Sequence, residues 1–396
     1  MSGLPLHGVR VVELSHMVMG PTCGMILGDL GAEVIKVEPV AGDGTRRLPG
    51  AGAGFFRAFN RNKSSLALDI ETRQGREAML ALIDTADVFI ENFRPGRMRQ
   101  LGLDYAALQA RNPRLIYAAH KGFLSGPYGN RLALDEVVQM MAGLAYMTGP
   151  PGRPLRAGSS VNDIMGGMFG VIGVLAALRE RDRSGRGCEV QAALYENCVL
   201  LAAQHMQQYA VTGKIPEPMP SRISAWAIYD VFEFAEGQQM FLAATGDRQW
   251  RALCQLLGLG ELLADPLLAT NAERVAQRPR LLGQLAGIFA SMPAQALAAQ
   301  LQAHDVPFAL IRQPHELFDD PHLLQSGGLA PLQLEDGGFT SVPLLPFSLA
   351  GRRLQPRQPM ARIGEHSHPI MKALGYSDLQ IAQLCAAGVL NIAAPG

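Results

Sequence analysis

Val9-Arg-Val-Val-Glu-Leu14 and Glu33-Val-Ile-Lys-Val-Glu38 are two short runs rich in β-branched residues. Runs of this length and composition are typical of buried strands. Between them, Gly20-Pro21 begins a pattern of helical period that continues to Leu30. A strand, a helix and a second strand in this order form a βαβ unit, whose strands are parallel. The beginning of the chain therefore predicts a parallel sheet with a helix on one face.

The same alternation continues as far as residue 212. Predicted helices cover residues 73–85, 105–110, 163–183 and 195–212, and predicted strands cover residues 87–93, 114–119 and 189–194. Alternating strands and helices pack as a mostly parallel sheet with helices on both faces. We therefore predict an α/β fold for this part of the chain.

The period of the apolar residues changes after residues 216–222, a segment with three prolines that cannot continue a helix. Residues 229–234 and 238–244 alternate around Glu236-Gly237, which predicts an antiparallel hairpin, and the residues after them have helical spacing. Residues 327–359 are again dense in proline and glycine, and lead to a final helix that Ser377 caps and Gly388 ends. We therefore expect a large domain formed by residues 1–215 and 326–396, and a smaller α+β domain formed by residues 216–325.

The composition limits the classes of partner. Charged residues make up 18% of the 396 residues, below the roughly 25% of soluble proteins, so we expect a partner subunit to cover part of the surface. Thirty-five basic residues balance thirty-five acidic ones, which argues against a nucleic-acid or membrane-surface protein. Five scattered cysteines without ligand spacing argue against a disulfide framework or a zinc site, and indicate a reducing cytoplasm.

No targeting or membrane segment is expected. The N-terminus has no basic region followed by an apolar run, so it does not resemble a signal peptide. The longest apolar run, residues 164–178, has 15 residues, which is too short to span a bilayer comfortably, so we expect a buried core helix.

One segment of the chain carries only positive charges. Between Asp43 and Asp69 there are five basic residues and no acidic one: Arg46, Arg47, Arg57, Arg61 and Lys63. Such a segment suits a polyphosphate such as coenzyme A (CoA), and a solvated basic loop is the alternative. The glycines at 50, 52 and 54 do not make a dinucleotide-binding loop, because Phe55 stands where the third glycine is required.

Asp163 stands at the start of the predicted helix 163–183. Aspartate is a favoured N-cap residue, and this would explain its position without any chemistry. Four glycines follow at positions 166, 167, 170 and 173, and each costs the helix about 0.5 to 1 kcal/mol. We therefore expect another backbone or a ligand to approach this side of the helix.

Several motifs together resemble one family nearly end to end. They are residues 6–14, Gly20-Pro21, 29–39, Gly42-Asp43 through Arg46, Asn60-Arg-Asn-Lys63, 86–96, Gly122-Phe123, Ser125-Gly-Pro-Tyr128, Asn162-Asp163, Gly364-Glu-His366 and Leu374-Gly-Tyr-Ser377. The chain resembles the class III CoA-transferases, the group that contains formyl-CoA transferase, carnitine CoA-transferase and α-methylacyl-CoA racemase. The resemblance implies a Rossmann-like large domain and an interlaced homodimer of ring-shaped subunits.

The resemblance also implies roles for single residues. Asp163 falls on the family's nucleophilic aspartate, which favours the catalytic interpretation over capping. The family's CoA contacts fall on His16, Val18, Met19, Arg46, Lys63, Asn92, Phe93, Arg94 and Asp135. Because Val18 and Met19 replace the glutamine and alanine of formyl-CoA transferase, we expect a more apolar floor to the pocket. A further departure is Asp135, which stands where formyl-CoA transferase has a tyrosine.

One difference from the racemases of this group distinguishes racemisation from CoA transfer. The racemases carry a Gly-His-Asp triplet whose histidine exchanges the α-proton, and here the matching residues are Ala133-Leu134-Asp135. The second base is therefore missing, unless the nearby His120 replaces it. The sequence favours CoA transfer, and leaves a racemase of 2-methylacyl-CoA and a non-catalytic CoA-binding protein as alternatives.

The implied mechanism needs neither a metal nor a permanently bound cofactor, because acyl-CoA is itself the substrate. A carboxylate is ionised near pH 7 and can attack the acyl-CoA directly, forming an aspartyl-CoA thioester. The glycines after Asp163 are expected to offer backbone N–H groups to the oxyanion. The resemblance suggests succinyl-CoA as donor and a small dicarboxylate or a sulfur analogue as acceptor, with Arg156, Arg222 and Arg312 as candidates to hold its second carboxylate.

Overall fold

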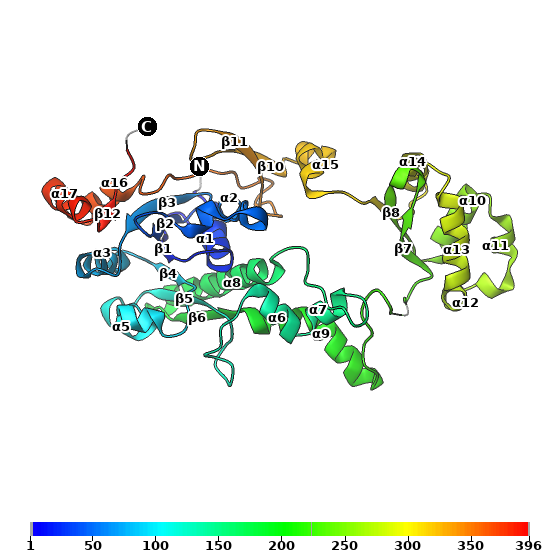
Figure 1. Cartoon of the computed structure of the whole chain (residues 1–396), viewed down its shortest axis with the longest axis horizontal. Coiled ribbons are helices and arrows are strands. Elements are labelled where there is room, and N and C mark those ends of the chain that lie inside the picture. Colours follow the sequence, from blue (N-terminus) through cyan, green and yellow to red (C-terminus); the bar gives the residue numbers. More distant parts are fainter. Residues whose placement is uncertain (1–2, 223, 395–396) are drawn as a thin grey trace. The chain divides into compact units, whose positions relative to one another are not determined.

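The computed structural model describes residues 3–222 and 224–394, which form two compact units (Figure 1). The first unit consists of Met1–Pro220 and Pro321–Gly396, and the second consists of Ser221–Asp320. The chain thus leaves the first unit and returns to it, and each unit has a hydrophobic core of its own.

A sheet of seven strands forms the centre of the first unit as far as the structure describes it, in the order β12-β3-β2-β1-β4-β5-β6. Its strands are β1 (Arg10–Leu14), β2 (Glu33–Glu38), β3 (Lys63–Leu68), β4 (Val88–Glu91), β5 (Ile116–Lys121), β6 (Glu189–Ala193) and β12 (Leu390–Asn391). Strands β1 to β6 are parallel, and the short β12 pairs antiparallel with β3. The predicted βαβ unit is confirmed by the pairing of Arg10 with Glu33.

Helices cover both faces of this sheet (Figure 1). On one face lie α1 (Met19–Asp29) and α8 (Val161–Ser184), and on the other lie α3 (Arg73–Asp84), α4 (Arg97–Leu101), α5 (Tyr105–Arg111), α16 (Ser367–Ala373) and α17 (Asp378–Ala386). The alternation of β1 explains the two cores, because Val11 packs into the core of the first face and Val12 into that of the second. This α/β fold with a parallel central sheet confirms the prediction.

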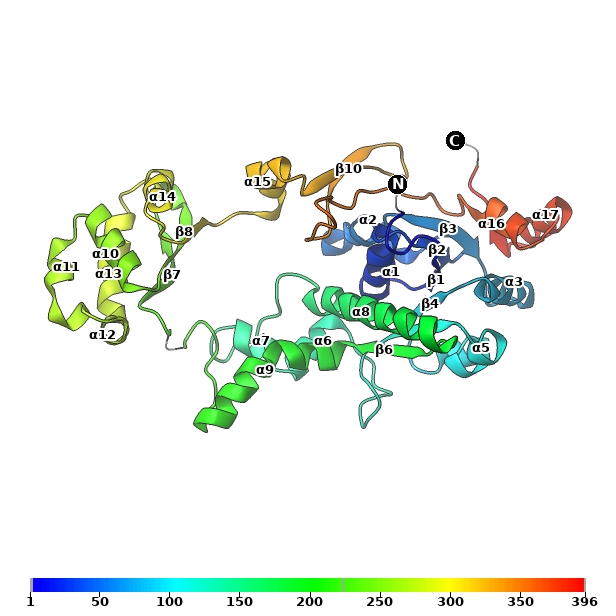
Figure 2. The ribbon, with the colours of Figure 1, turned by 180° about the vertical axis from the view of Figure 1, so that it is seen from behind.

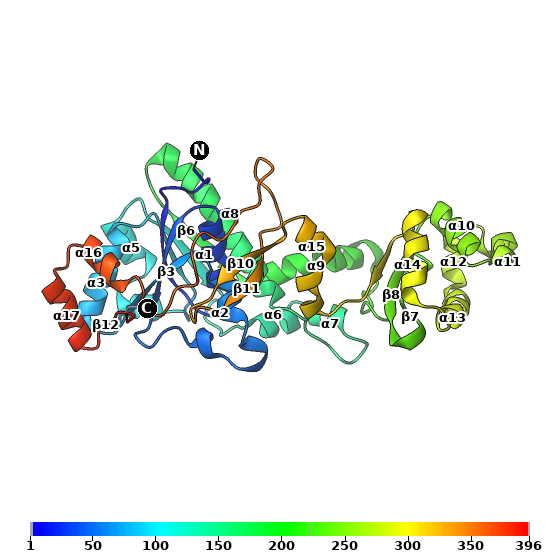
Figure 3. The ribbon, with the colours of Figure 1, turned by 90° about the horizontal axis from the view of Figure 1, so that it is seen from above.

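The glycines of α8 allow it to lie close to its neighbours, α1, β5 and β6 (Figure 3). A Cβ atom added to Gly166 would lie 2.4 Å from Met19 Cε, and one added to Gly173 would lie 2.4 Å from Val190 Cγ1. The close approach expected from the sequence is therefore made by the protein itself. Side chains of α1 and of the sheet, not a ligand, fill the space beside these glycines.

The apolar character of α8 follows from the same packing. The helix has 24 residues, and by length and composition alone it could cross a membrane. The expectation that this segment is too short to span a bilayer is therefore wrong. Its buried side nevertheless packs on α1 and the sheet, with Val171, Val174 and Leu178 in the core of that face. The structure thus places α8 as a core helix of the first unit.

Gly170 is the position in α8 where a side chain should be most harmful. Its added Cβ would lie 2.3 Å from Nε2 of His120, whose ring is buried. We expect Gly170→Ala to lower the free energy of unfolding by about 1 to 3 kcal/mol, as overpacked cores do. Urea denaturation measures this, and Gly158→Ala is the control, because an added Cβ there meets nothing within 4 Å. Equal stability of the two variants would contradict the packing described.

The second unit combines a small antiparallel sheet with helices (Figure 2). Strands β7 (Ile228–Glu233), β8 (Gln239–Ala244) and β9 (Phe308–Leu310) are paired in sequence order, which confirms the predicted hairpin. The helices are α10 (Asp247–Leu256), α11 (Gly260–Ala264), α12 (Asn271–Ala276), α13 (Arg278–Phe289) and α14 (Ala294–Ala303). Trp250 and Phe289 lie in its core.

The returning segment completes the edge of the large sheet. It forms α15 (Pro321–Gln325) and a hairpin of β10 (Leu329–Gln333) and β11 (Phe339–Pro343), and then α16, α17 and β12. His366 N–H donates to Ser65 O, and Ser367 Oγ accepts from Ala67 N–H, so this segment is bonded to β3. Ser377 caps α17, as predicted.

Candidate active site

Asp163 lies within the first turn of α8, at the edge of the sheet where the parallel strands end. The N-cap of α8 is Ser160, so the interpretation of Asp163 as the capping residue is wrong. Its carboxylate is half-buried and accepts no hydrogen bond from any residue that the structure describes. A carboxylate without partners in such a place is available for chemistry.

Asp135 performs the capping that Asp163 does not. It begins α6 (Asp135–Met141), and its Oδ2 accepts hydrogen bonds from the N–H groups of Asn162, at 2.9 Å, and Asp163, at 3.0 Å. Its other oxygen accepts from the side-chain amide of Gln139. Asp135 is buried and both oxygens are engaged, so it positions the start of α8; its expected contact with CoA stays a prediction.

The surroundings of Asp163 disfavour its charged form. Burial, together with the negative charges of Asp135 and Glu136, raises the pKa of Asp163 to about 7, although the positive charge of Arg156 acts in the opposite direction. The expectation that this carboxylate is fully ionised near pH 7 is therefore wrong, because near that pH both forms are populated. The ionised form is a stronger nucleophile for having lost part of its solvation.

The oxyanion donors expected from the sequence are not available. Gly166, Gly167 and Gly170 lie inside α8, where each N–H group bonds to the carbonyl four residues earlier. The N–H groups of Asn162 and Asp163 already donate to Asp135. These groups therefore hold the helix together and its start in place, and they do not face a substrate.

His16, Asn92 and Phe93 meet where β1 and β4 end, at the point where the order of the strands reverses. His16 N–H donates to Asn92 Oδ1 at 3.0 Å, and Asn92 Nδ2 donates back to His16 O at 2.8 Å. The rings of His16 and Phe93 are 5.2 Å apart. Open α/β sheets bind their ligands at such a switch point, so the structure brings these three predicted residues together in a suitable place.

Val18 and Met19 form an apolar wall between this switch point and Asp163. Val18 is fully buried and precedes the first turn of α1, and the side chain of Met19 packs on Gly166, one turn of α8 after Asp163. The start of α1 and the start of α8 are thus adjacent.

The charges of Arg46 and Lys63 are already paired with carboxylates near the ends of β2 and β1. Arg46 forms two hydrogen bonds with the carboxylate of Glu38, and Nζ of Lys63 lies 2.7 Å from Oε2 of Glu13. Burial lowers the pKa of Lys63 to about 8, although Glu13 counteracts it. Both cations therefore bond to carboxylates inside the protein, and their contact with CoA stays a prediction.

The basic segment carries less unpaired charge in the fold than its sequence suggests, and its binding of a polyphosphate stays a prediction. Nη2 of Arg61 lies 2.6 Å from Oδ2 of Asp29, and the side chains of Arg61, Arg46 and Lys63 are all buried. Acidic residues from distant parts of the chain thus cancel most of a charge that looks one-signed in the sequence. The periodicity of the sequence does not show these ion pairs, because the acidic partners belong to other helices and strands.

Arg94 borders a cavity of about 700 Å³ beyond the ends of β4 and β5. Its lining includes Phe93, Tyr105 and Phe123, and two cations that are not among the predicted site residues, Arg99 and Lys121. Lys121 could have been found, because it directly precedes the Gly122-Phe123 motif at the end of β5. Phe93 links this cavity to the switch point through its contact with His16.

His120 does not supply the missing second base. Burial lowers the pKa of His120 to about 4, and its ring lies between β5 and Gly170 of α8, about two turns away from Asp163. Neither ring nitrogen has a hydrogen-bond partner of acceptable geometry among the described residues. It is a neutral core histidine.

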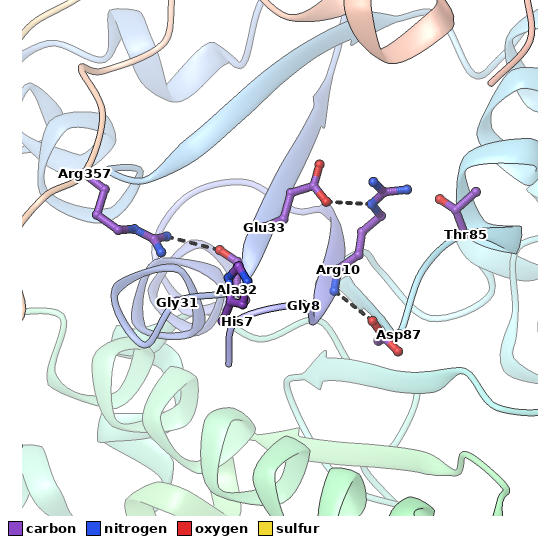
Figure 4. Close-up of a pocket in the computed structure, with 9 residues that line it drawn as sticks. All are labelled: His7, Gly8, Arg10, Gly31, Ala32, Glu33, Thr85, Asp87 and Arg357. Carbon is purple, nitrogen blue, oxygen red and sulfur yellow. Dashed lines mark hydrogen bonds and ion pairs between the residues drawn. The ribbon is translucent and has the colours of Figure 1, made fainter. Parts of the chain in front are cut away.

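A second cavity, of about 510 Å³, lies at the opposite edge of the sheet, where the strands begin (Figure 4). Arg10 Nε donates to Glu33 at 2.7 Å and its backbone N–H donates to Asp87 at 2.8 Å. Arg357 donates to the carbonyls of Gly28 and Ala32. Of the charged groups that line this cavity, Arg10 and Glu33 pair with each other, whereas Asp87 and Arg357 bond to backbone groups. None of these residues is a predicted site residue.

Known proteins are similar to this chain over nearly its whole length. A succinate–glutarate CoA-transferase of Agrobacterium fabrum is 34% identical over 384 residues, which cover 93% of this chain and 96% of the relative. A succinyl-CoA:mesaconate CoA-transferase of Haloarcula hispanica is 34% identical over 332 residues, which cover 80% and 83%. The crystal structure of a CAIB/BAIF family protein from Brucella suis has a TM-score of 0.85 and 34% identity, and covers 94% of this chain and 100% of that one. CoA-transferase family III matches residues 6–367, and the chain belongs to this family.

Proposed function

We propose that the protein transfers CoA from succinyl-CoA to a small dicarboxylate or a sulfur analogue, through a thioester on Asp163. The observation that carries this proposal is the half-buried carboxylate of Asp163, which accepts no hydrogen bond from the part of the chain that the structure describes. Asp135 holds the backbone of Asp163 at the start of α8. The relatives named as succinate–glutarate and succinyl-CoA:mesaconate CoA-transferases support the choice of substrates.

In the proposed reaction, an oxygen of Asp163 attacks the thioester carbonyl of succinyl-CoA, the C–S bond breaks, and a mixed anhydride and CoA thiolate form. The thiolate then attacks the carbonyl of Asp163, which releases succinate and leaves the aspartyl-CoA thioester. The acceptor carboxylate attacks this thioester, and the released thiolate attacks the acceptor carbonyl of the new anhydride. The products are the acceptor's CoA thioester and the free carboxylate of Asp163, with no net uptake or release of protons.

The pKa of Asp163 predicts the pH dependence. The nucleophile is the ionised form, which is populated above the pKa, so kcat/KM for succinyl-CoA should be constant well above pH 7. Below about pH 7 it should fall about tenfold for each pH unit. Initial rates between pH 5 and 9 in a buffer of constant ionic strength measure this. A midpoint near 4, the usual range of an aspartate, would contradict the environment described.

The CoA moiety is proposed to occupy the switch point and the adjoining cavity. The cavity is bordered by three cations and three acids: Arg94, Arg99, Lys121, Glu91, Asp104 and Glu189. Arg99 pairs with Asp104 at 3.4 Å, so Arg94 and Lys121 are the cations that support this cavity as the place of the CoA phosphates. His16, Asn92 and Phe93 lie between the cavity and the start of α1, along the path that pantetheine needs to reach Asp163. No residue of the second unit enters this part of the proposal.

A homodimer in the cytoplasm, interlaced in the way the resemblance implies, completes the proposal. One side of α8 exposes four large apolar side chains at helical spacing, those of Met168, Phe169, Ile172 and Leu175. Apolar surface of this kind is typical of a protein interface. It agrees with the low content of charged residues, and native mass spectrometry would test the dimer.

A substrate panel tests the proposed activity. The protein is incubated with succinyl-CoA or acetyl-CoA and a series of mono- and dicarboxylic acids, and new thioesters are identified by mass. Transfer to dicarboxylates supports the proposal. Incorporation of solvent deuterium at the α-carbon of a 2-methylacyl-CoA, without transfer, would instead show a racemase, and binding of CoA without either reaction would show a non-catalytic protein.

A further inference from the structure

An exposed ion pair lies beside Asp163. Nη1 of Arg156, in the loop that leads into α8, pairs with Oε1 of Glu136, in the first turn of α6. Glu136 directly follows Asp135, whose carboxylate holds the N–H group of Asp163. The side chains of Arg156 and Glu136 are 39% and 50% exposed, so a solute can reach both.

The backbone that carries Arg156 is fixed although its guanidinium is exposed. The N–H group of the next residue, Ala157, donates to Gln139 Oε1 at 2.8 Å, and the amide nitrogen of Gln139 donates to Asp135. Asp135 in turn accepts from Asp163. One chain of hydrogen bonds therefore joins the arginine loop to the proposed nucleophile, and Arg156 keeps its place when its side-chain partner changes.

The partner of Arg156 can be exchanged at small cost. Exposed ion pairs contribute only about 0 to 1 kcal/mol, because water solvates both charges well once they separate. A guanidinium binds a carboxylate through two parallel hydrogen bonds, and a substrate carboxylate presents the same two oxygens as Glu136. Glu136 thus occupies a place that a second carboxylate of the substrate can take.

Arg156 is also the candidate that shares a compact unit with Asp163. The other two arginines considered from the sequence, Arg222 and Arg312, belong to the second unit, and Arg312 lies 3.8 Å from Asp320. The charge of Arg156 acts directly on Asp163, as does that of Glu136. Arg156 is therefore near enough to Asp163 to interact with a substrate bound there.

We infer that Arg156 determines the preference for dicarboxylates, by leaving Glu136 and binding the carboxylate at the far end of the succinyl group and of the acceptor. This inference rests on the proposed function. Glu136 then acts as a substitute for that carboxylate in the empty site, and monocarboxylic substrates leave the Arg156–Glu136 pair closed.

The test measures how fast the CoA thioester forms on Asp163 with succinyl-CoA and with butyryl-CoA, which has the same chain length but no second carboxylate. Wild-type protein, Arg156→Gln, Arg156→Lys, Glu136→Gln and Arg153→Gln are compared at one pH by intact mass. Because each variant is tested with both substrates at that pH, its succinyl-to-butyryl ratio is independent of the ionisation of Asp163. Arg153→Gln is the matched control, since Arg153 lies in the same exposed loop.

Arg156→Gln should lower the succinyl-to-butyryl ratio about 30- to 100-fold, the range of a lost hydrogen bond to a charged group, with butyryl-CoA nearly unaffected. Arg156→Lys should recover part of the ratio, Glu136→Gln should raise it, and Arg153→Gln should leave it unchanged. An unchanged ratio in Arg156→Gln, or an equal loss with both substrates, would overturn the inference. Absence of any adduct in the wild-type protein would instead overturn the proposed function.

Discussion

Asp163→Asn should lower the rate of CoA transfer by at least about 10⁴-fold, the usual scale when a covalent nucleophile is lost. An amide has nearly the same shape as the carboxylate, so the start of α8 and its bonds to Asp135 should survive. Steady-state transfer from succinyl-CoA, followed by separation of the thioesters, measures the loss. Thermal denaturation of the same preparation should show an intact fold.

Asp182→Asn is the matched control for this variant. Asp182 lies in the last turns of the same helix, is exposed, and is far from the end that carries Asp163. Its replacement should change the rate less than about twofold, because exposed substitutions away from the site have small effects. Transfer by Asp163→Asn at a rate close to that of the control would show that another group is the nucleophile.

Glu13→Gln should lower the free energy of unfolding by about 3 to 5 kcal/mol, the range for breaking a buried ion pair. Glu13 is fully buried in β1, where its carboxylate lies between Nζ of Lys63, at 2.7 Å, and Nζ of Lys36, at 3.4 Å. Removing its charge leaves Lys63 without its anion. Urea denaturation followed by far-UV circular dichroism measures the change.

Glu33→Gln is the control for Glu13→Gln, because Glu33 makes an exposed ion pair with Arg10 in the neighbouring strand. It should cost less than about 1 kcal/mol. The buried pair also lies under the loop from Ser15 to Met19, since Ser15 Oγ donates to Glu13 and Lys36 donates to Ser15 O. Glu13→Gln should therefore weaken CoA transfer as well, and a loss of stability equal to that of the control would contradict the network described.

The parallel sheet could be predicted because its strands are apolar and buried on both faces. β1, β2, β4 and β6 each follow or precede a helix of clear period, and their existence was foreseen. β3 was missed as a strand, because Lys63, Ser64 and Ser65 at its start are polar residues that bond to groups elsewhere in the fold. The hairpin of β10 and β11 was hidden by the prolines and glycines around it.

The site could be predicted only as far as its residues lie in local motifs. Asp163, His16, Asn92 and Phe93 were found in this way, and the last three contact one another in the fold. The shared chain of hydrogen bonds from Ala157 to Asp163 could not be foreseen, because its members lie up to 28 residues apart and meet only when α6 packs against α8.

The pairing of the charged residues could likewise not be predicted from the sequence. In the sequence, five cations between Asp43 and Asp69 look available to a polyphosphate, but Arg46, Arg61 and Lys63 are neutralised by acids from other strands and helices. The pKa of Asp163 likewise depends on burial and on Asp135, which precedes it by 28 residues. The ion pairs and the pKa values of the site depend on contacts made in the fold, so they could not be predicted from the local sequence.

Mapping of the CoA adduct tests the central claim most directly. The protein is mixed with succinyl-CoA, quenched in acid and digested, and the peptides are analysed by mass spectrometry with and without reduction by borohydride. The account predicts CoA on the peptide that contains Asp163, conversion of that side chain to an alcohol by borohydride, and loss of the adduct when an acceptor acid is added. Efficient transfer with no adduct on Asp163, or with the adduct on another residue, would contradict it.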